Sequence, residues 1–106
     1  MYTISKMFAF SASHQLHGLP LEHPCSRLHG HNYEIIVELR ADTLNNVGFV
    51  KDYRELDGLK IYIDDVLDHR DLNNVLHFNP TAENIARHLF EEFKITNAGQ
   101  YFPAFV

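Results

Sequence analysis

The sequence predicts an α+β domain in which an antiparallel sheet is followed by two helices. Two stretches within the first 40 residues alternate between apolar and polar side chains, a period of two that is typical of half-buried strands. Two later stretches repeat apolar residues at helical spacing. The chain has 106 residues, of which 45% are apolar and 22% charged, the length and composition of one globular domain. We therefore expect a single domain over residues 1–106.

The first predicted strand covers residues 2–14 and the second begins near residue 28 and ends near residue 40. One parity of each strand is mainly apolar and the other mainly polar, as in a sheet with one packed and one wet face. Residues 15–24 contain one glycine and two prolines and are expected to form a loop. Residues 48–53 are either a short third strand or an extended lead-in to the first helix. The packed parity consists of Ile4, Phe8, Phe10, Ala12 and His14 in the first strand and His29, His31, Tyr33, Ile35, Val37 and Leu39 in the second.

The two predicted helices lie in the second half of the chain. The first covers residues 54–67, although Gly58 weakens it by about 1 kcal/mol relative to alanine. The second begins within residues 79–81, where a polar cap and a proline at an early position favour a helix start. Its apolar face contains Ile85 and Leu89. The tail over residues 94–106 is apolar, without clear periodicity.

Composition excludes several classes of partner. The net charge is -5 and no basic patch dominates, so neither a nucleic acid nor an anionic membrane surface is expected as a partner. No apolar stretch approaches the roughly 18 residues of a membrane helix, and the N-terminus lacks the layout of a signal peptide. A single cysteine excludes an internal disulfide and favours a reducing, cytoplasmic setting.

Histidine is the unusual feature of the composition, with eight residues against nine lysines and arginines. His29 and His31 are two apart on one predicted strand, so their rings point to the same face. If the strands pair through the intervening loop, His14 lies beside them. Three imidazoles with an open fourth position are typical of a catalytic zinc site. The alternative is that these are hydrogen-bonded strand histidines, because His-x-His alone is a weak pattern. The remaining histidines are expected at loops or the surface: His17, His23, His77 and His88.

Two further positions are candidates for proton transfer. Cys25 lies in a polar loop near Arg27, and nearby positive charge lowers a thiol pKa and makes a thiolate available as base or nucleophile. Alternatively Cys25 is a small buried apolar residue. Asp68 and His69 are adjacent at the end of the first helix, where His69 could equally be favoured by the helix dipole.

Taken together, the motifs resemble those of the 6-pyruvoyltetrahydropterin synthase and 6-carboxytetrahydropterin synthase family over about residues 3–92. They occur in the family's order. The motifs are Phe10-Ser11-Ala12-Ser13-His14, Cys25 with His29-Gly30-His31, Asp52, Leu67-Asp68-His69 with Leu72-Asn73, and Asn79-Pro80-Thr81-Ala82-Glu83-Asn84.

This resemblance implies a tunnelling fold (T-fold), an antiparallel sheet with two helices on one face. Three subunits would join their sheets into a barrel, two trimers would stack into a homohexamer, and active sites would lie between subunits. His14, His29 and His31 match the family's zinc ligands. Cys25 matches the catalytic cysteine, and Asp68 and His69 match its partners from a neighbouring subunit.

The resemblance also implies the reaction. The family's substrate is 7,8-dihydroneopterin triphosphate, and no redox cofactor is needed. The short spacing in Cys25-x-x-x-His29-Gly30-His31 resembles the bacterial enzymes of queuosine biosynthesis. We therefore expect a cytoplasmic, zinc-dependent lyase that forms 6-carboxy-5,6,7,8-tetrahydropterin. The alternatives are 6-pyruvoyltetrahydropterin synthase, a related pterin side-chain lyase, or a truncated zinc-binding paralogue with little activity.

The chain departs from the family pattern after the second helix. Family members add two strands and a glutamate that anchors the pterin ring, whereas no Asp or Glu follows Glu92 here. We expect the C-terminal strands to be missing or altered, with the sheet edge either exposed or covered by the apolar tail.

Overall fold

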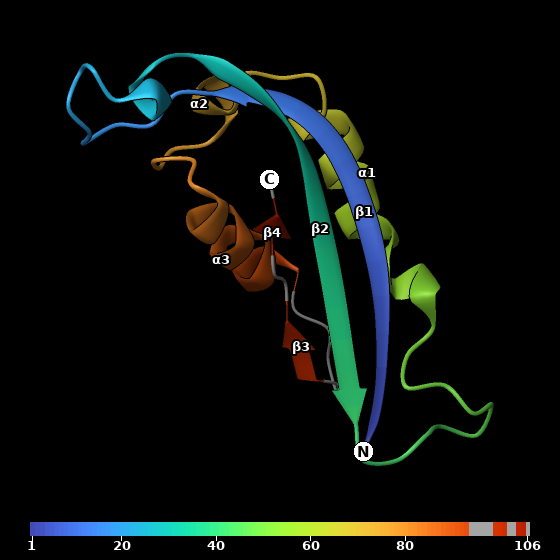
Figure 1. Ribbon diagram of the computed structural model, residues 1–106. Coiled ribbons are helices and arrows are strands. Elements are labelled where there is room, and N and C mark those ends of the chain that lie inside the picture. Colours follow the sequence, from blue (N-terminus) through green and yellow to red (C-terminus); the bar gives the residue numbers. More distant parts are fainter. Residues whose placement is uncertain (94–98, 102–103, 106) are drawn as a thin grey trace.

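The computed structural model describes residues 1–93, 99–101 and 104–105. Two long strands come first, a composite helix and a short helix follow, and a longer helix and two short strands end the described chain (Figure 1). The elements are β1 (Tyr2–His14), η1 (Pro24–Ser26), β2 (His29–Ala41), η2 (Tyr53–Leu56), α1 (Asp57–Tyr62), η3 (Ile63–Leu67), α2 (Leu72–Val75), α3 (Ala82–Glu92), β3 (Gly99–Tyr101) and β4 (Ala104–Phe105).

The sheet is built on an antiparallel pair of 13-residue strands. β1 and β2 pair without a bulge from Tyr2 opposite Ala41 to His14 opposite His29. Both predicted strands are confirmed to within about one residue, because the period-two pattern marks the same residues that pair. The other edge of β2 pairs with two short segments of the tail, β3 near Glu38 and β4 near Glu34. Because the tail shows no clear periodicity, the sequence predicts neither of these two short strands.

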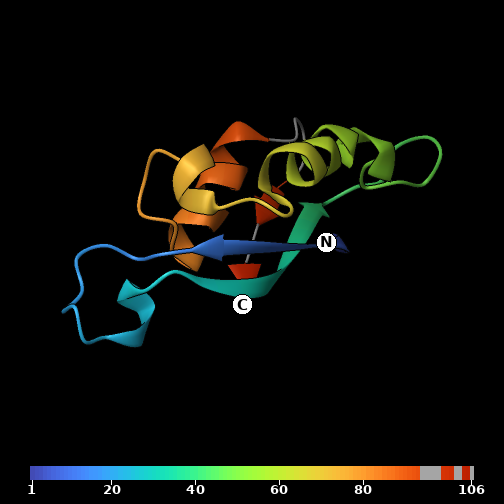
Figure 2. The ribbon, with the colours of Figure 1, turned by 90° about the horizontal axis from the view of Figure 1, so that it is seen from above.

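One face of the sheet forms the core. The helices α1, α2 and α3 lie on this face (Figure 2), so the apolar parity of each strand packs beneath them. The Phe10 and Tyr33 rings stack across the two strands, with centroids 4.7 Å apart. The antiparallel α+β architecture is therefore confirmed. The buried apolar side chains of the two strands are Phe8, Phe10, Ala12, Tyr33, Ile35, Val37 and Leu39.

The first predicted helix is present as three consecutive helical forms, η2, α1 and a π-helical turn, η3. The Asp52 side chain caps its start by accepting a hydrogen bond from the Arg54 amide. Residues 48–52 are a lead-in and not a strand, and Tyr53 begins η2. The turn before this lead-in is closed on the Asn45 side chain. The π turn ends where the Asp68 amide bonds to the Ile63 carbonyl at 2.8 Å, which turns the chain back toward β1.

The second predicted helix, α3, begins one residue after Thr81, whose hydroxyl accepts from the Asn84 amide at 3.1 Å. Ile85 and Leu89 anchor it in the core. The four-residue α2 was not expected, although Asp71 caps it in the usual way. Within the described residues, no helix has the length and apolar character needed to cross a membrane.

Candidate metal centre and active site

The three histidines of the sequence motif meet at one end of the sheet. His14 and His29 are the last pair of the β1–β2 ladder, and His31 pairs with Ala12 one step inward on the same face. Their ring nitrogens offer three ligand atoms that all lie within 4.8 Å of one another. The strand register therefore places three imidazoles around one point.

The hydrogen bonds of two rings fix which nitrogen carries the proton. The Nδ1 atom of His14 lies 2.8 Å from the Pro80 carbonyl, and that of His29 lies 2.6 Å from the Arg27 carbonyl. Because a carbonyl oxygen only accepts, both Nδ1 atoms are donors, and each neutral ring keeps its lone pair on Nε2.

The two Nε2 atoms face each other at 3.0 Å. Two lone pairs at that distance repel unless a cation or proton lies between them. Tetrahedral Zn–N bonds of about 2.0–2.1 Å would set two ligand nitrogens about 3.3 Å apart, close to the observed spacing. The donor set therefore fits a metal ion held by His14, His29 and His31, with both backbone carbonyls orienting the rings.

The surroundings of His14 and His31 favour the neutral form of these two imidazoles. His14 is buried, and burial, the largest influence, holds its pKa below the usual 6.5 despite the opposing effects of the Pro80 carbonyl and Asp71. The pKa of His31 is also lowered, first by burial and then by the charges of the other two rings. Neutral imidazole is the form that binds metal, so the site is preorganised for a cation at neutral pH.

Tyr33 lies directly beneath the cluster. Its hydroxyl oxygen is 3.0 Å from the Nδ1 atom of His14, and its side chain is 0% exposed. Burial raises the pKa of Tyr33 to about 12, so the phenol is neutral at physiological pH. Neither Tyr33 nor Pro80 was identified from the sequence as part of the site.

Cys25 lies in the η1 turn and its side chain is partly buried. Its amide donates to the Nδ1 atom of His23 at 3.1 Å, and its carbonyl accepts from the Leu16 amide at 2.9 Å. The second of these bonds ties the turn to the chain that leaves His14. The alternative interpretation of Cys25 as a small, buried apolar residue does not fit, because the side chain is only partly buried.

Asp68 and His69 lie along the outer edge of β1. Asp68 accepts from the Ser11 amide at 2.9 Å and from the His69 ring at 2.9 Å, and these bonds, the Ser11 bond first, hold the pKa of the carboxyl below its usual range. The His69 amide donates to the Ser11 carbonyl at 2.6 Å, and its backbone is left-handed with φ of 57°. Among the described residues, no hydrogen bond or ion pair joins this pair to Cys25.

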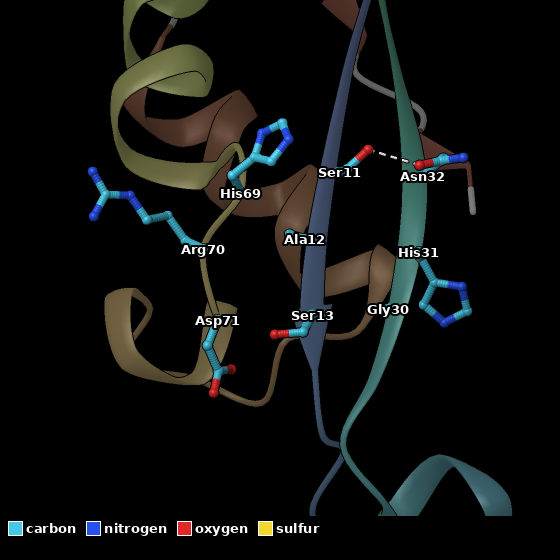
Figure 3. Close-up of a pocket in the computed structure, with 9 residues that line it drawn as sticks. All are labelled: Ser11, Ala12, Ser13, Gly30, His31, Asn32, His69, Arg70 and Asp71. Carbon is cyan, nitrogen blue, oxygen red and sulfur yellow. Dashed lines mark hydrogen bonds between the residues drawn. The ribbon is translucent and has the colours of Figure 1, made fainter.

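A shallow hollow of about 550 Å³ lies on the two strands near this end of the sheet. Figure 3 shows His69, Arg70 and Asp71 on one side of β1 and His31 beyond β2. Ser11 and Asn32 are joined across the strands by a 2.7 Å hydrogen bond. His14, His29 and Cys25 do not line the hollow, so it adjoins the histidine cluster without enclosing it. The lining residues are Ser11, Ala12, Ser13, Gly30, His31, Asn32, His69, Arg70 and Asp71.

The four remaining histidines have other roles. His77 is exposed and His23 caps η1, in keeping with a loop or surface position. The His17 ring contacts Asn73. His88 differs from the expectation, because its ring is partly buried against Phe78 and bonds to the Tyr62 hydroxyl at 2.8 Å.

A family model described as 6-pyruvoyl tetrahydropterin synthase matches residues 3–101. The chain belongs to this family. The match confirms the resemblance carried by the histidine, cysteine and Asp-His motifs.

Curated relatives of the family carry both product names. A putative 6-pyruvoyl tetrahydrobiopterin synthase of Caenorhabditis elegans is 33% identical over 106 aligned residues, covering 87% of this chain and 76% of the relative. A putative 6-carboxy-5,6,7,8-tetrahydropterin synthase of Archaeoglobus fulgidus is 33% identical over 84 residues, covering 79% and 69%. The solved structure of the Caenorhabditis elegans 6-pyruvoyl tetrahydropterin synthase superposes with a TM-score of 0.74 at 27% identity, covering 94% of each chain. This family member therefore shares fold and sequence with tetrahydropterin synthases.

Proposed function

We propose that the protein is a zinc-dependent lyase that converts 7,8-dihydroneopterin triphosphate to 6-carboxy-5,6,7,8-tetrahydropterin. The observation that carries the proposal is the pair of Nε2 atoms at 3.0 Å, each left as an acceptor by a carbonyl on the opposite side of its ring. With His31 they form a three-imidazole donor set, and such sets leave a fourth position for substrate.

His14, His29 and His31 would hold the zinc ion. When bound, the ion supplies Lewis-acid polarisation of the hydroxyl-bearing pterin side chain, which acidifies the neighbouring carbon. The carbonyls of Arg27 and Pro80 keep two of the rings oriented, so that the site need not reorganise when substrate enters.

Cys25 is the proposed base. As a thiolate it would remove the proton from the acidified carbon, after which triphosphate leaves by elimination; addition of one water molecule to the resulting side chain and cleavage of its carbon–carbon bond would give the ring carboxylate and acetaldehyde. Asp68 and His69 are the proposed proton relay. Because their bonds are to each other and to Ser11, the pair is preorganised on the edge of β1, and we assign it to the active site of a neighbouring copy.

The edge of β1 that faces away from β2 is only partly paired, since the Ser13 amide donates to the Arg70 carbonyl at one end, and the unpaired part supports such an assembly. On this edge the backbone of Ser11 bonds to Asp68 and His69, and the Ser5 carbonyl accepts from the Tyr53 hydroxyl. Among the described residues, no hydrogen bond is recorded on that side of Met7 or Ala9. Unpaired strand edges favour pairing with another strand, so we propose a homo-oligomer, a trimer or a dimer of trimers, in which sheets join at β1.

The direct test is to incubate the zinc-loaded protein with 7,8-dihydroneopterin triphosphate and to identify the products by mass spectrometry. We expect 6-carboxy-5,6,7,8-tetrahydropterin with release of acetaldehyde and triphosphate. Detection of the pyruvoyl product alone would replace the proposed reaction by its sister reaction.

The sister reaction, synthesis of 6-pyruvoyltetrahydropterin, is the second candidate because the matching family model and one close relative carry that name. A zinc-binding paralogue with little activity is the third, because residues 94–106 contain no carboxylate side chain to anchor a pterin ring. A protein that holds zinc but forms no product from the substrate would favour this last candidate.

A further inference from the structure

The chain that leaves His14 is held by two asparagine side chains. Asn73 accepts from the Gln15 amide at 2.8 Å and donates to the Gln15 carbonyl at 2.9 Å. Asn79 accepts from the His17 amide at 2.9 Å and donates to the His17 carbonyl at 3.0 Å. Each side-chain amide thus makes both bonds that a paired residue of a neighbouring strand would make.

Leu16, which lies between Gln15 and His17, makes its backbone hydrogen bond on the opposite side of the chain. The Leu16 amide donates to the Cys25 carbonyl at 2.9 Å, on the side away from the asparagines. Residues 15–17 therefore connect Asn73 and Asn79 on one side to the turn that carries Cys25 on the other. The five bonds form a continuous link from the α2–α3 region to the proposed base.

The same connection reaches the metal centre. Pro80, whose carbonyl orients the His14 ring, directly follows Asn79. The carbonyl of Asn79 is itself fixed by the Thr81 amide and by the Asn84 side chain, at 2.8 and 3.0 Å. Hence one short segment sets the orientation of His14 and the position of Cys25 together.

We propose that Asn73 and Asn79 are positioning residues that fix Cys25 relative to the histidine cluster. Among the described residues, no hydrogen bond joins either asparagine to the histidine cluster or to the Cys25 side chain, and the two act through the backbone of residues 15–17. The importance of that position for catalysis rests on the proposed function, whereas the placement itself can be measured without substrate.

Isosteric variants of Asn73 and Asn79 show whether these side chains act through their hydrogen bonds to the backbone or only by filling space. Asn73→Asp and Asn79→Asp keep the shape and one acceptor but lose the donor, and they set a carboxylate oxygen against a carbonyl. Asn74→Asp is the matched control. It adds the same charge at the next position of α2, and the exposed Asn74 side chain has no hydrogen bond recorded among the described residues.

The readout is the rate at which iodoacetamide alkylates Cys25, the single cysteine of the chain, in zinc-loaded protein across pH 6–9. Freeing the turn increases the population of its open form, so we expect alkylation about tenfold faster for Asn73→Asp and Asn79→Asp. Asn74→Asp should stay within about twofold of the wild type. Equal rates for all three folded variants would overturn the proposal.

A second measurement needs no variant. In the wild type, the amide hydrogens of Gln15, Leu16 and His17 should exchange slowly with solvent although they lie outside the strands, whereas those of Leu21 and Glu22 should exchange fast. Exchange of the first three at the rate of the last two would also overturn the proposal. Turnover provides an independent readout, because displacement of Cys25 should lower kcat more than it changes KM. An inactive wild type would contradict the proposed function, but the alkylation and amide-exchange measurements would still decide whether the two asparagines position Cys25.

Discussion

Replacing Tyr33 by phenylalanine tests the packing beneath the metal centre. The Tyr33 side chain is 0% exposed, its ring stacks on Phe10 at 4.7 Å, and its hydroxyl is 3.0 Å from the Nδ1 atom of His14. Tyr33→Phe keeps the ring and removes the hydroxyl, which shares the single Nδ1 proton of His14 with the Pro80 carbonyl. Because His14 keeps its 2.8 Å bond to the Pro80 carbonyl, no buried group is left without a partner. The expected loss of unfolding free energy at pH 7 is therefore about 1 kcal/mol.

The pH dependence of this loss gives a sharper test. Burial raises the pKa of Tyr33 to about 12 from the 10.0 that is usual for a tyrosine in water. A folded-state pKa above the unfolded value means that the neutral phenol stabilises the fold fully below pH 10, and that this stabilisation disappears as the pH rises through 12. The raised pKa corresponds to about 3 kcal/mol in total, of which about half is lost by pH 11. Tyr33→Phe has no such loss.

Urea unfolding of the metal-free proteins at pH 7 and pH 11 measures the difference. The wild type should be more stable at pH 7, and the two proteins should be about equally stable at pH 11. Tyr2→Phe, which removes an exposed phenol with no hydrogen bond among the described residues, controls for the general effect of losing one tyrosine. A stability difference between wild type and Tyr33→Phe of the same size at both pH values would refute the reasoning.

Three further predictions concern catalysis, packing and the metal. Cys25→Ala should abolish turnover while the zinc content stays unchanged, and full activity would remove Cys25 from the mechanism. Leu89→Ala should lower the unfolding free energy by about 2–5 kcal/mol because the side chain is 0% exposed, whereas Arg87→Ala on the exposed face of α3 should change it little. The pKa values of His14 and His31 are lowered, so protons compete with the metal at these two rings only below pH 6.5, and metal-indicator titration should find zinc retained at pH 7 and released under acid.

The paired strands were predictable from sequence because side-chain parity carries the information. A period of two places Phe10 and Tyr33 on one face, and the same parity brings His14 to the face of His29 and His31. The asparagine-proline-threonine start of α3 was readable for a similar local reason, since Thr81 caps the helix with its own side chain.

The partners that orient the site were not predictable in this way. The Pro80 carbonyl reaches His14 across 66 residues, and the Asn73 side chain reaches Gln15 across 58. A backbone carbonyl has no sequence signature, and an asparagine that pairs with a distant backbone resembles any loop asparagine. Strands β3 and β4 were also missed, because two or three residues are too few to show a period.

Metal analysis of purified protein tests the central claim, that three imidazoles hold one ion. We expect about one zinc per chain in the wild type, a loss of most of it in His29→Ala, and wild-type content in His77→Ala, which changes an exposed histidine. A wild-type protein that is folded and stays metal-free in the presence of zinc, or a His29→Ala variant that retains its full content, would contradict the account.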